Sequence, residues 1–365
     1  MVSHECALRP TPGGVQRCTQ EYMAILGAAG LEPKAVSYRE DRRWLTRLRR
    51  KLFPRPYRDK LPPDFFRSCL KRAEEEDVRW IFLNHCDPLP MVAKMKQSKA
   101  AAYRYAFLSH GIDSTDFVQE RRIDGQPITF REKCFLGEQL FDEVEQRKHL
   151  DLVCCLSGQD EALEKWLGAK QTLVFPRICQ TRPLPANTVP GRIGMVATLN
   201  HPPNWEGVRL FAEALTRHAG AKMRLVGGPA EEGAMLAREF PIIEYLGFLD
   251  DERLEQEAAT WACFVNPLFC MPRGVSTKLA VGLEWGIPVA TTRAGARGYR
   301  WDEKILPLAD GPDELARLAL RQAEKEQQEQ ARMGSRKIAD LAPTLAELGD
   351  LLRKKMAEIE NSHQF

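Results

Sequence analysis

The chain has 365 residues, with 44% hydrophobic and 28% charged residues, which is an ordinary composition for a soluble globular protein. The net charge of +3 is a small difference between 53 basic and 50 acidic residues, so it indicates no class of partner. No apolar run approaches the roughly 20 residues that a bilayer span needs, and the opening residues lack the apolar core of a signal peptide. These features predict a cytoplasmic protein with two domains.

Ten cysteines are scattered along the chain without a CxxC pair, which is typical of free thiols rather than of a zinc site or a disulfide scaffold. His4, His85 and His201 also lack the spacing of metal ligands. We therefore expect no protein-bound metal and no other cofactor.

Short apolar runs alternate with polar helical stretches, as in parallel βαβ units. The first half has runs at 78–85, 105–111 and 150–158. The second half has predicted strands at 192–199, 222–228, 242–249, 261–268 and 288–291. Predicted helices occupy 204–220, capped by Asn204 and stopped by Gly220, and 276–286, 312–334 and 344–362.

The segment 180–191 holds three prolines and no periodic apolar pattern, which favours a linker. The sequence thus predicts an α/β protein with two Rossmann-like domains facing across a cleft. We expect an N-terminal acceptor domain at 1–180, a linker at 181–191 and a C-terminal donor domain at 192–342. The helix within 343–365 is expected to cross back to the N-terminal domain.

Two stretches have the chemistry of phosphate binding. Gly13 and Gly14 precede a predicted helix, so backbone N–H groups there allow close approach of an anion, although a plain tight turn is an equal alternative. Arg273 and Lys278 flank Ser276 and Thr277 at the start of another helix, where unpaired N–H groups favour phosphate. The alternative there is an ordinary capped helix. Together the two stretches predict a diphosphate held between the domains.

The stretches "PTPGGVQRCTQEYMAILGAAG", "GMVATLNHPPNWEGVRLFAEAL", "MRLVGGPAEE", "IEYLGFLDD" and "KLAVGLEWGIPVATTRAGARG" resemble, in order and spacing, family-4 glycosyltransferases with the GT-B fold. The resemblance spans nearly the whole chain. It implies a nucleotide-sugar donor, an acceptor hydroxyl, retention of configuration and no metal. The donor-binding residues that it implies are Gly13, Gly14, Asn200, Gly228, Phe248, Arg273, Gly274, Val275, Ser276, Thr277 and Lys278.

The chain departs from the family at two places. The family has a Glu, seven residues and a second Glu, which typically hold the donor sugar and the ribose, but this chain has Arg273 and Val281 at those positions. Glu284 lies three residues further on, and helix geometry points it away from Val281. The family's basic pair after the first strand of the second domain is replaced by Asn200 and His201.

Candidate catalytic residues follow two first-domain strands. His110 closes a strand in "LSHGID", and the resemblance places its counterpart near the donor sugar. Asp87 in "NHCDP" follows the preceding strand, and either Asp87 or Glu5 is a candidate base toward an acceptor hydroxyl. The spacing selects neither.

The segment 42–60 is strongly basic and has an apolar stripe at helical spacing. It is typical either of a surface helix that docks by its apolar face or of a helix on an anionic membrane. The residues expected to meet the membrane are Trp44, Arg47, Arg49, Arg50 and Lys51. No nucleic-acid recognition fold accompanies this segment, so we expect no nucleic-acid partner.

The sequence therefore predicts a hexosyltransferase-like enzyme, cytoplasmic or peripheral at the inner membrane face. Its expected role is the assembly of bacterial surface polysaccharide or glycoconjugate on a glycan or lipid-linked acceptor. A second hypothesis is a catalytically silent GT-B module that binds a glycan or a partner transferase, because both family carboxylates are absent. A sugar-nucleotide epimerase or phosphorylase is a third and weaker one.

Overall fold

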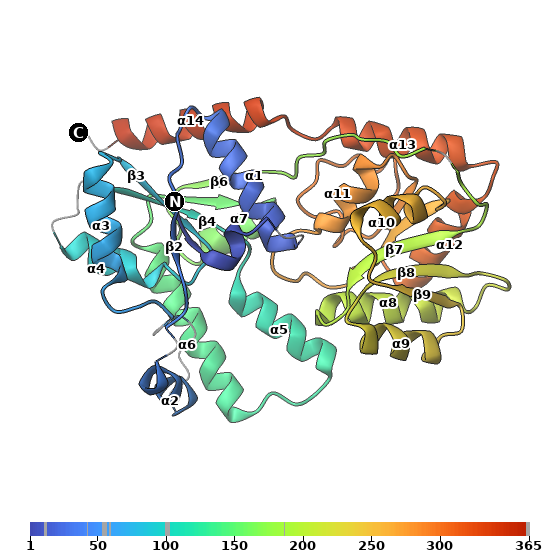
Figure 1. Cartoon of the computed structure of the whole chain (residues 1–365), viewed down its shortest axis with the longest axis horizontal. Helices are drawn as coiled ribbons and strands as arrows, with labels where there is room; N and C mark the ends of the chain where they lie inside the picture. Colours follow the sequence, from blue (N-terminus) through green and yellow to red (C-terminus); the bar gives the residue numbers. More distant parts are fainter. Residues whose placement is uncertain are drawn as a thin grey trace. The chain divides into compact units, whose positions relative to one another are not determined.

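The computed structural model describes residues 1–10, 13–41, 43–52, 57, 60–98, 103–185 and 187–362. The chain divides into two compact units (Figure 1). The first unit comprises Met1–Val118, Gln126–Phe175 and Thr344–Phe365, and the second comprises Gln119–Gly125 and Pro176–Pro343. No helix in the described part of the chain is long and apolar enough to cross a membrane.

The first unit contains a parallel sheet in the order β2-β1-β3-β4-β5-β6. Its central strands β3 and β5 are buried along their whole length, as expected for parallel strands that are covered on both faces. The strands are β1 (Val2–His4), β2 (Val36–Tyr38), β3 (Trp80–Asn84), β4 (Arg104–Leu108), β5 (Leu152–Cys155) and β6 (Thr172–Val174).

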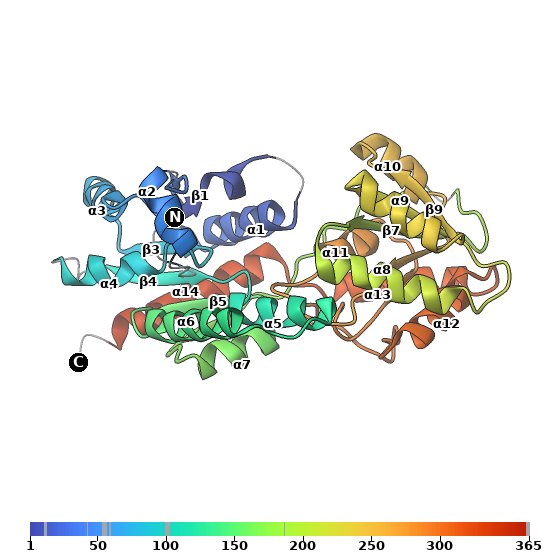
Figure 2. The ribbon, with the colours of Figure 1, turned by 90° about the horizontal axis from the view of Figure 1, so that it is seen from below.

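Helices flank this sheet on both faces (Figures 1 and 2). The described helices that precede the second sheet in chain order are the 3-10 helix η1 (Glu5–Leu8) and the α-helices α1 (Gly14–Ala28), α2 (Trp44–Leu52), α3 (Phe65–Glu75), α4 (Pro90–Gln97), α5 (Asp113–Asp124), α6 (Phe130–Arg147) and α7 (Gly158–Trp166). Part of α5 belongs to the second unit.

The last helix, α14 (Leu345–Asn361), belongs to the first unit and lies beside α1. The approach is closest at Gly349, where an added Cβ would lie 2.5 Å from the backbone carbon of Ala28. Trp80 Nε1 of β3 donates a hydrogen bond to Glu360 Oε1 at 2.7 Å. The C-terminal segment is thus an integral layer of the first unit.

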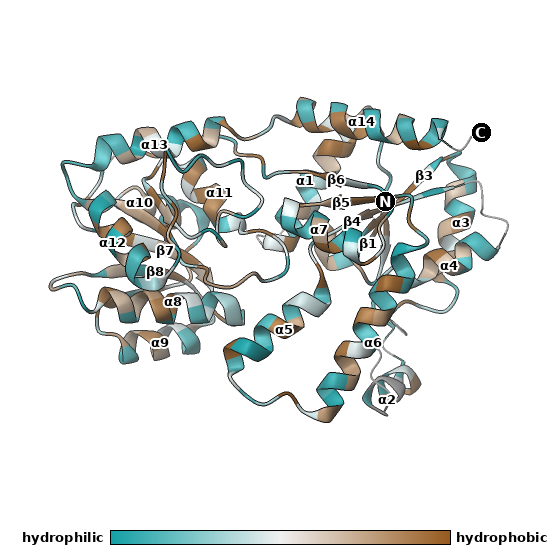
Figure 3. Ribbon diagram, turned by 180° about the vertical axis from the view of Figure 1, so that it is seen from behind, coloured by the Kyte–Doolittle hydropathy of each residue, from teal (hydrophilic) through white to brown (hydrophobic). Residues whose placement is uncertain are grey.

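The second unit contains a parallel sheet in the order β11-β10-β7-β8-β9. The strands are β7 (Ile193–Thr198), β8 (Met223–Gly228), β9 (Ile243–Gly247), β10 (Cys263–Asn266) and β11 (Val289–Thr291). The helices are α8 (Pro202–Leu215), α9 (Ala230–Glu239), α10 (Asp251–Ala258), α11 (Thr277–Glu284), α12 (Pro312–Ala323) and α13 (Gln328–Asp340). The strands β4 and β5 of the first unit are strongly hydrophobic (Figure 3).

The proline-rich segment expected as a linker is bound to the second unit. Its backbone N–H groups at Arg182, Leu184 and Val189 donate to carbonyls of Glu284, Trp285 and Thr260 at 2.7, 3.0 and 2.9 Å. A segment without periodicity still pairs its backbone groups when it lies extended along a surface. The two units divide earlier, after Phe175.

Two predicted helices differ from the observed ones. The helix expected at 312–334 breaks into α12 and α13 at Glu324, whose backbone is extended. The Ala323 carbonyl at the end of α12 accepts from Gly191 N–H at 3.0 Å. The helix expected at 204–220 begins two residues earlier, at Pro202, and ends at Leu215. Asn204 is therefore not its N-cap, and proline suits the first helical position because its missing N–H would have no partner there.

Candidate functional site

The carboxyl ends of four parallel strands place most predicted donor residues on one edge of the second sheet. Asn200 and Phe248 follow β7 and β9, and Gly228 is the last residue of β8. The segment Arg273–Lys278 follows β10 and includes the first two residues of α11. Phe248 is 78% exposed and Asn200 is also exposed, so both side chains are accessible. Ligands of open α/β sheets bind at this edge.

The segment 272–278 comprises the loop before α11 and the first two residues of that helix, and two side chains of the loop after β11 hold it. Gly274 turns with φ +75°, a conformation that favours glycine. The buried Arg297 guanidinium donates to the carbonyls of Pro272 and Gly274. The Tyr299 hydroxyl donates to the Ser276 carbonyl and accepts from Ala280 N–H at 2.9 Å. We call residues 272–278 the donor loop.

A buried asparagine connects the donor loop to the sheet. Asn266 ends β10 and is 1% exposed. Its Oδ1 accepts from the Ser276 hydroxyl at 3.0 Å, and its Nδ2 donates to Thr291 Oγ1 at 3.0 Å. Because Ser276 is engaged with Asn266, its side chain makes no capping hydrogen bond to α11. The start of α11 therefore lacks a side-chain acceptor from its N-cap residue, which favours an anionic ligand.

Lys278 reaches from α11 to the loop after β7. Its Nζ donates to Asn204 Oδ1 at 2.6 Å, and Asn204 Nδ2 donates to the Thr198 carbonyl at 2.9 Å. Burial lowers the pKa of Lys278 to about 8. A lysine with a lowered pKa and a neutral partner gains a counter-charge when an anion binds, so it suits a phosphate site.

Glu284 lies away from the donor loop. Its Oε1 accepts a hydrogen bond from Gln180 N–H at 3.3 Å, so the carboxylate holds the proline-rich segment. The half-buried Val281 occupies the position of the second family carboxylate.

The first unit gathers a second group of residues at the carboxyl edge of its sheet. Gly13 is the extended N-cap of α1, with φ 170°, and Gly14 is the first residue of that helix. Asn84 is the last residue of β3, and His110 follows β4 with 6% exposure. His85 has φ +77°, an uncommon conformation for a non-glycine residue, and its ring stacks on His110 with centroids 4.7 Å apart.

Asn84 is fully buried and makes three side-chain hydrogen bonds. Its Nδ2 donates to Ser3 Oγ at 2.9 Å and to Thr19 Oγ1 at 3.0 Å. Its Oδ1 lies 2.8 Å from His110 Nε2. Asn84 thereby joins strand β1, helix α1 and the turn after β4 that carries His110.

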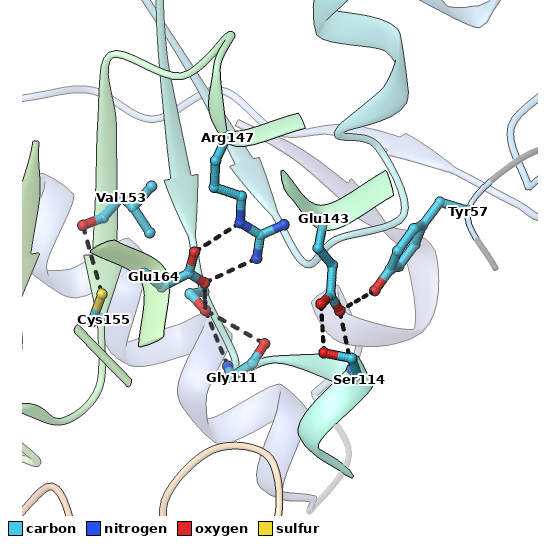
Figure 4. Close-up of polar contacts among 9 residues, drawn as sticks. Tyr57, Gly111, Ser114, Glu143, Arg147, Val153, Cys155 and Glu164 are labelled. Atoms are coloured by element: carbon cyan, nitrogen blue, oxygen red, sulfur yellow. Dashed lines mark hydrogen bonds and ion pairs between the residues drawn. The ribbon is translucent and has the colours of Figure 1, made fainter. Parts of the chain in front are cut away.

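The turn that carries His110 is also held by buried side chains of α6 and α7 (Figure 4). Ser109 Oγ donates to Glu164 Oε1 at 3.2 Å and accepts from Gly111 N–H at 3.1 Å. Arg147 Nε donates to Glu164 Oε2 at 2.7 Å, and both side chains are almost completely buried. The guanidinium also lies 5.1 Å from the centre of the Phe107 ring.

A second buried carboxylate holds the start of α5 (Figure 4). Glu143 accepts from the Tyr57 hydroxyl at 2.7 Å and from Ser114 N–H and Oγ at 3.0 and 2.6 Å. Burial raises the pKa of Glu143, and these hydrogen bonds act in the opposite direction. The turn 109–114 is therefore anchored to α6 and α7 at both ends.

The two candidate bases are both ion-paired. Asp87 Oδ1 lies 3.2 Å from Lys60 Nζ. Glu5 pairs with Arg39 and with Arg9, and the hydrogen bond from Arg39 lowers the pKa of Glu5. A lowered pKa makes a carboxylate a weaker base, which counts against Glu5 as the base.

The basic segment forms α2 with its apolar side chains in solvent. Trp44, Leu45 and Leu48 are 70%, 60% and 45% exposed. Arg47 and Lys51 are exposed as well. The side chains of Arg49 and Arg50 lie outside the described part, as do residues 42, 53–56 and 58–59.

Within the described residues, no cluster of three or more His, Cys, Asp or Glu side chains could hold a metal ion.

The residues that the sequence did not single out are those that hold others in place: Asn84, Arg147, Glu164, Asn266, Arg297 and Tyr299. The sequence contains one signal that could have identified two of them. Both buried asparagines end an apolar strand, in "IFLN" and "CFVN".

One family model matches part of this chain, and solved structures match almost all of it. Residues 190–324 match the model of the family described as glycosyl transferases group 1. No curated protein sequence matches the chain.

Solved structures match the chain over almost its whole length. The sucrose-phosphate synthase from Thermosynechococcus elongatus has a TM-score of 0.64 and 15% identity, over 99% of this chain and 98% of that one. HepE from Anabaena in complex with UDP-glucose has a TM-score of 0.60 and 14% identity, over 99% of both chains. The lipopolysaccharide outer core galactosyltransferase WaaB has a TM-score of 0.56 and 11% identity, over 99% of this chain and 98% of that one.

At these identities the structures establish the fold alone, and the chain has the GT-B fold. Residues 190–324 are similar to the group 1 glycosyl transferase family.

Proposed function

We propose that the protein is an enzyme that transfers a sugar from a nucleoside-diphosphate donor to an acceptor hydroxyl. The observation that carries this proposal is the donor loop, where a half-buried Lys278 adjoins a helix start without a side-chain cap. HepE has been solved with UDP-glucose, and a uridine donor is therefore the first to test.

In the proposed reaction the bond between the sugar C1 and the phosphate oxygen breaks, and the acceptor oxygen bonds to C1. Negative charge develops on the leaving diphosphate. The Lys278 ammonium, the nearby Arg273 and the N–H groups of α11 stabilise that charge, so we propose that no protein-held metal is required. His110 is the proposed contact of the transferred sugar, and Asp87 is the proposed base. Retention of configuration follows the family resemblance.

The acceptor that we propose is a glycan or a lipid-linked glycan of a bacterial surface polymer. The match to WaaB, a lipopolysaccharide core galactosyltransferase, supports this choice.

The test is release of nucleoside diphosphate from a panel of sugar nucleotides, with and without glycan acceptors and with and without EDTA. We expect release with at least one donor and no effect of EDTA. The absent family carboxylates favour a second candidate, a silent module that binds the donor or a glycan. Donor binding by thermal shift without transfer to any acceptor would support that candidate.

We also propose that α2 contacts an anionic membrane surface. An amphipathic helix with exposed tryptophan and leucine beside exposed basic residues inserts its apolar side chains at the headgroup level. In the described part of the chain these side chains are not needed for packing.

Replacing Arg47 and Lys51 with Gln is expected to weaken binding to phosphatidylglycerol vesicles by about 30-fold, because each basic residue near the surface contributes about 1 kcal/mol. Vesicle co-sedimentation at low salt measures this. The matched control is Arg353→Gln with Lys354→Gln, which removes two exposed charges from α14. Equal loss in both double variants, or no binding of the wild type, would contradict the membrane contact.

A further inference from the structure

We infer that Asn84 and Ser109 are positioning residues that fix the tautomer and the backbone turn of His110, so that His110 Nδ1 serves as a hydrogen-bond acceptor. The inference rests on the proposed function only for the ligand, which would be a hydroxyl group of the transferred sugar. Its structural basis is a set of hydrogen bonds within the first unit.

The orientation of the Asn84 amide follows from Thr19. The hydroxyl of Thr19 has one proton, which it donates to the Val15 carbonyl at 2.8 Å. Thr19 Oγ1 therefore accepts the hydrogen bond from Asn84, and the atom that faces it must be the donor Nδ2. The Asn84 oxygen Oδ1 is then the atom that faces His110.

The tautomer of His110 follows in turn. Because Asn84 Oδ1 only accepts, the ring nitrogen 2.8 Å away from it must carry a proton. That nitrogen is Nε2, so the neutral ring has Nδ1 as its acceptor nitrogen. A histidine held in this way accepts a hydrogen bond from a hydroxyl group and does not donate one.

The backbone around His110 is fixed separately. Ser109 Oγ donates to Glu164 Oε1 at 3.2 Å and accepts from Gly111 N–H at 3.1 Å. Ser109 and Gly111, the residues on either side of His110, are therefore both held in place. Tyr22 strengthens the turn, since its hydroxyl donates to the Ser109 carbonyl at 2.6 Å and its ring meets His110 edge-on. Glu164 is itself oriented by the bidentate contact with Arg147.

Three side chains from different elements meet in this cluster. Ser3, Thr19 and Asn84 are arranged so that one orientation of the Asn84 amide is allowed. In a functional histidine, the group that hydrogen-bonds one ring nitrogen determines which of the two nitrogens is protonated.

The first experiment reads the tautomer directly by nitrogen-15 NMR of the seven histidine rings, with the His110 signals assigned by their loss in His110→Gln. We expect the Nε2–H form in the wild type and in Asn84→Asp, whose carboxylate still accepts from Nε2. In Asn84→Leu we expect a mixture of tautomers. The Nδ1–H form in the wild type, or an unchanged ring in Asn84→Leu, would overturn the inference.

The second experiment measures turnover and UDP affinity separately. Asn84→Leu and Ser109→Ala are expected to lower kcat by up to about 100-fold, the effect of a misplaced group at a reacting centre. Their affinity for UDP should stay within about twofold, because the donor loop belongs to the other unit. Ser157→Ala is the matched control, since it removes an equally buried hydroxyl at the start of α7.

A fall in kcat of the same size in Ser157→Ala would overturn the positioning role. If the wild type neither binds UDP nor turns over, the proposed function fails, and the NMR experiment still decides the tautomer. The two failures are therefore distinguishable.

Discussion

Replacing Lys278 with Met is expected to weaken binding of UDP by about 10- to 150-fold at pH 7, because a charged hydrogen bond contributes about 1.5–3 kcal/mol. Lys278 Nζ has a neutral partner in Asn204, so the ammonium is available to pair with a phosphate. Isothermal titration calorimetry measures the change. Lys222→Met, an exposed lysine immediately before β8 at the opposite end of the strand, is the matched control.

The same lysine predicts a pH dependence with a definite sign. Its pKa of about 8 in the free protein means that the ammonium loses its proton as the pH rises through 8. A bound diphosphate favours the protonated form and raises the pKa, so binding takes up a proton. The affinity of the wild type should be nearly constant between pH 7 and 8 and should fall above 8 by up to about tenfold per pH unit. A fall of equal slope in Lys278→Met would remove Lys278 from the donor site.

Glu164→Leu is expected to lower the free energy of unfolding by about 3–5 kcal/mol, the cost of leaving one partner of a buried ion pair alone. Arg147 is 1% exposed, and its Nη1 has no hydrogen-bond partner among the described residues, so the Glu164 carboxylate is its principal counter-charge. Urea denaturation followed by circular dichroism gives the value.

The double variant Arg147→Met with Glu164→Leu separates stability from positioning. Replacing both charges by apolar side chains of similar volume is often neutral, so most of the lost stability should return. Turnover should remain low, because Ser109 has lost its contact with Glu164 in both variants. Recovery of turnover together with stability would show that the ion pair acts only on folding.

The strands were predictable where apolar runs were long enough. The predictions at 192–199 and 222–228 agree with β7 and β8, and that at 78–85 agrees with β3. Strands β1, β2 and β6 have three residues each, too few for any period to show. The equally short β11 was predicted because the helix expected to end at Gly286 precedes it. The helix break after Ala323 was not predicted either, and the partner of the Ala323 carbonyl there is a distant backbone group, Gly191 N–H.

The candidate site was predictable as a set of loop residues and not as a network. Sequence order places the donor loop and His110 after strands, and parallel topology then places them at sheet edges. What holds them was not visible in sequence. Arg297 and Tyr299 lie 25 and 23 residues from their partners Pro272 and Ser276. Asn84 lies 65 residues from Thr19, so only the folded chain shows that the two meet.

The placement of α14 has a consequence for the order in which the chain folds during synthesis. The first 175 residues leave the ribosome without the helix that covers α1, and the whole second unit emerges before that helix does. The second unit can therefore mature first, while the first unit keeps the contact surface of α1 around Ala28 open until Leu345–Asn361 arrives. A nascent chain arrested before residue 344 should consequently offer chaperones an apolar face on the earlier-made unit.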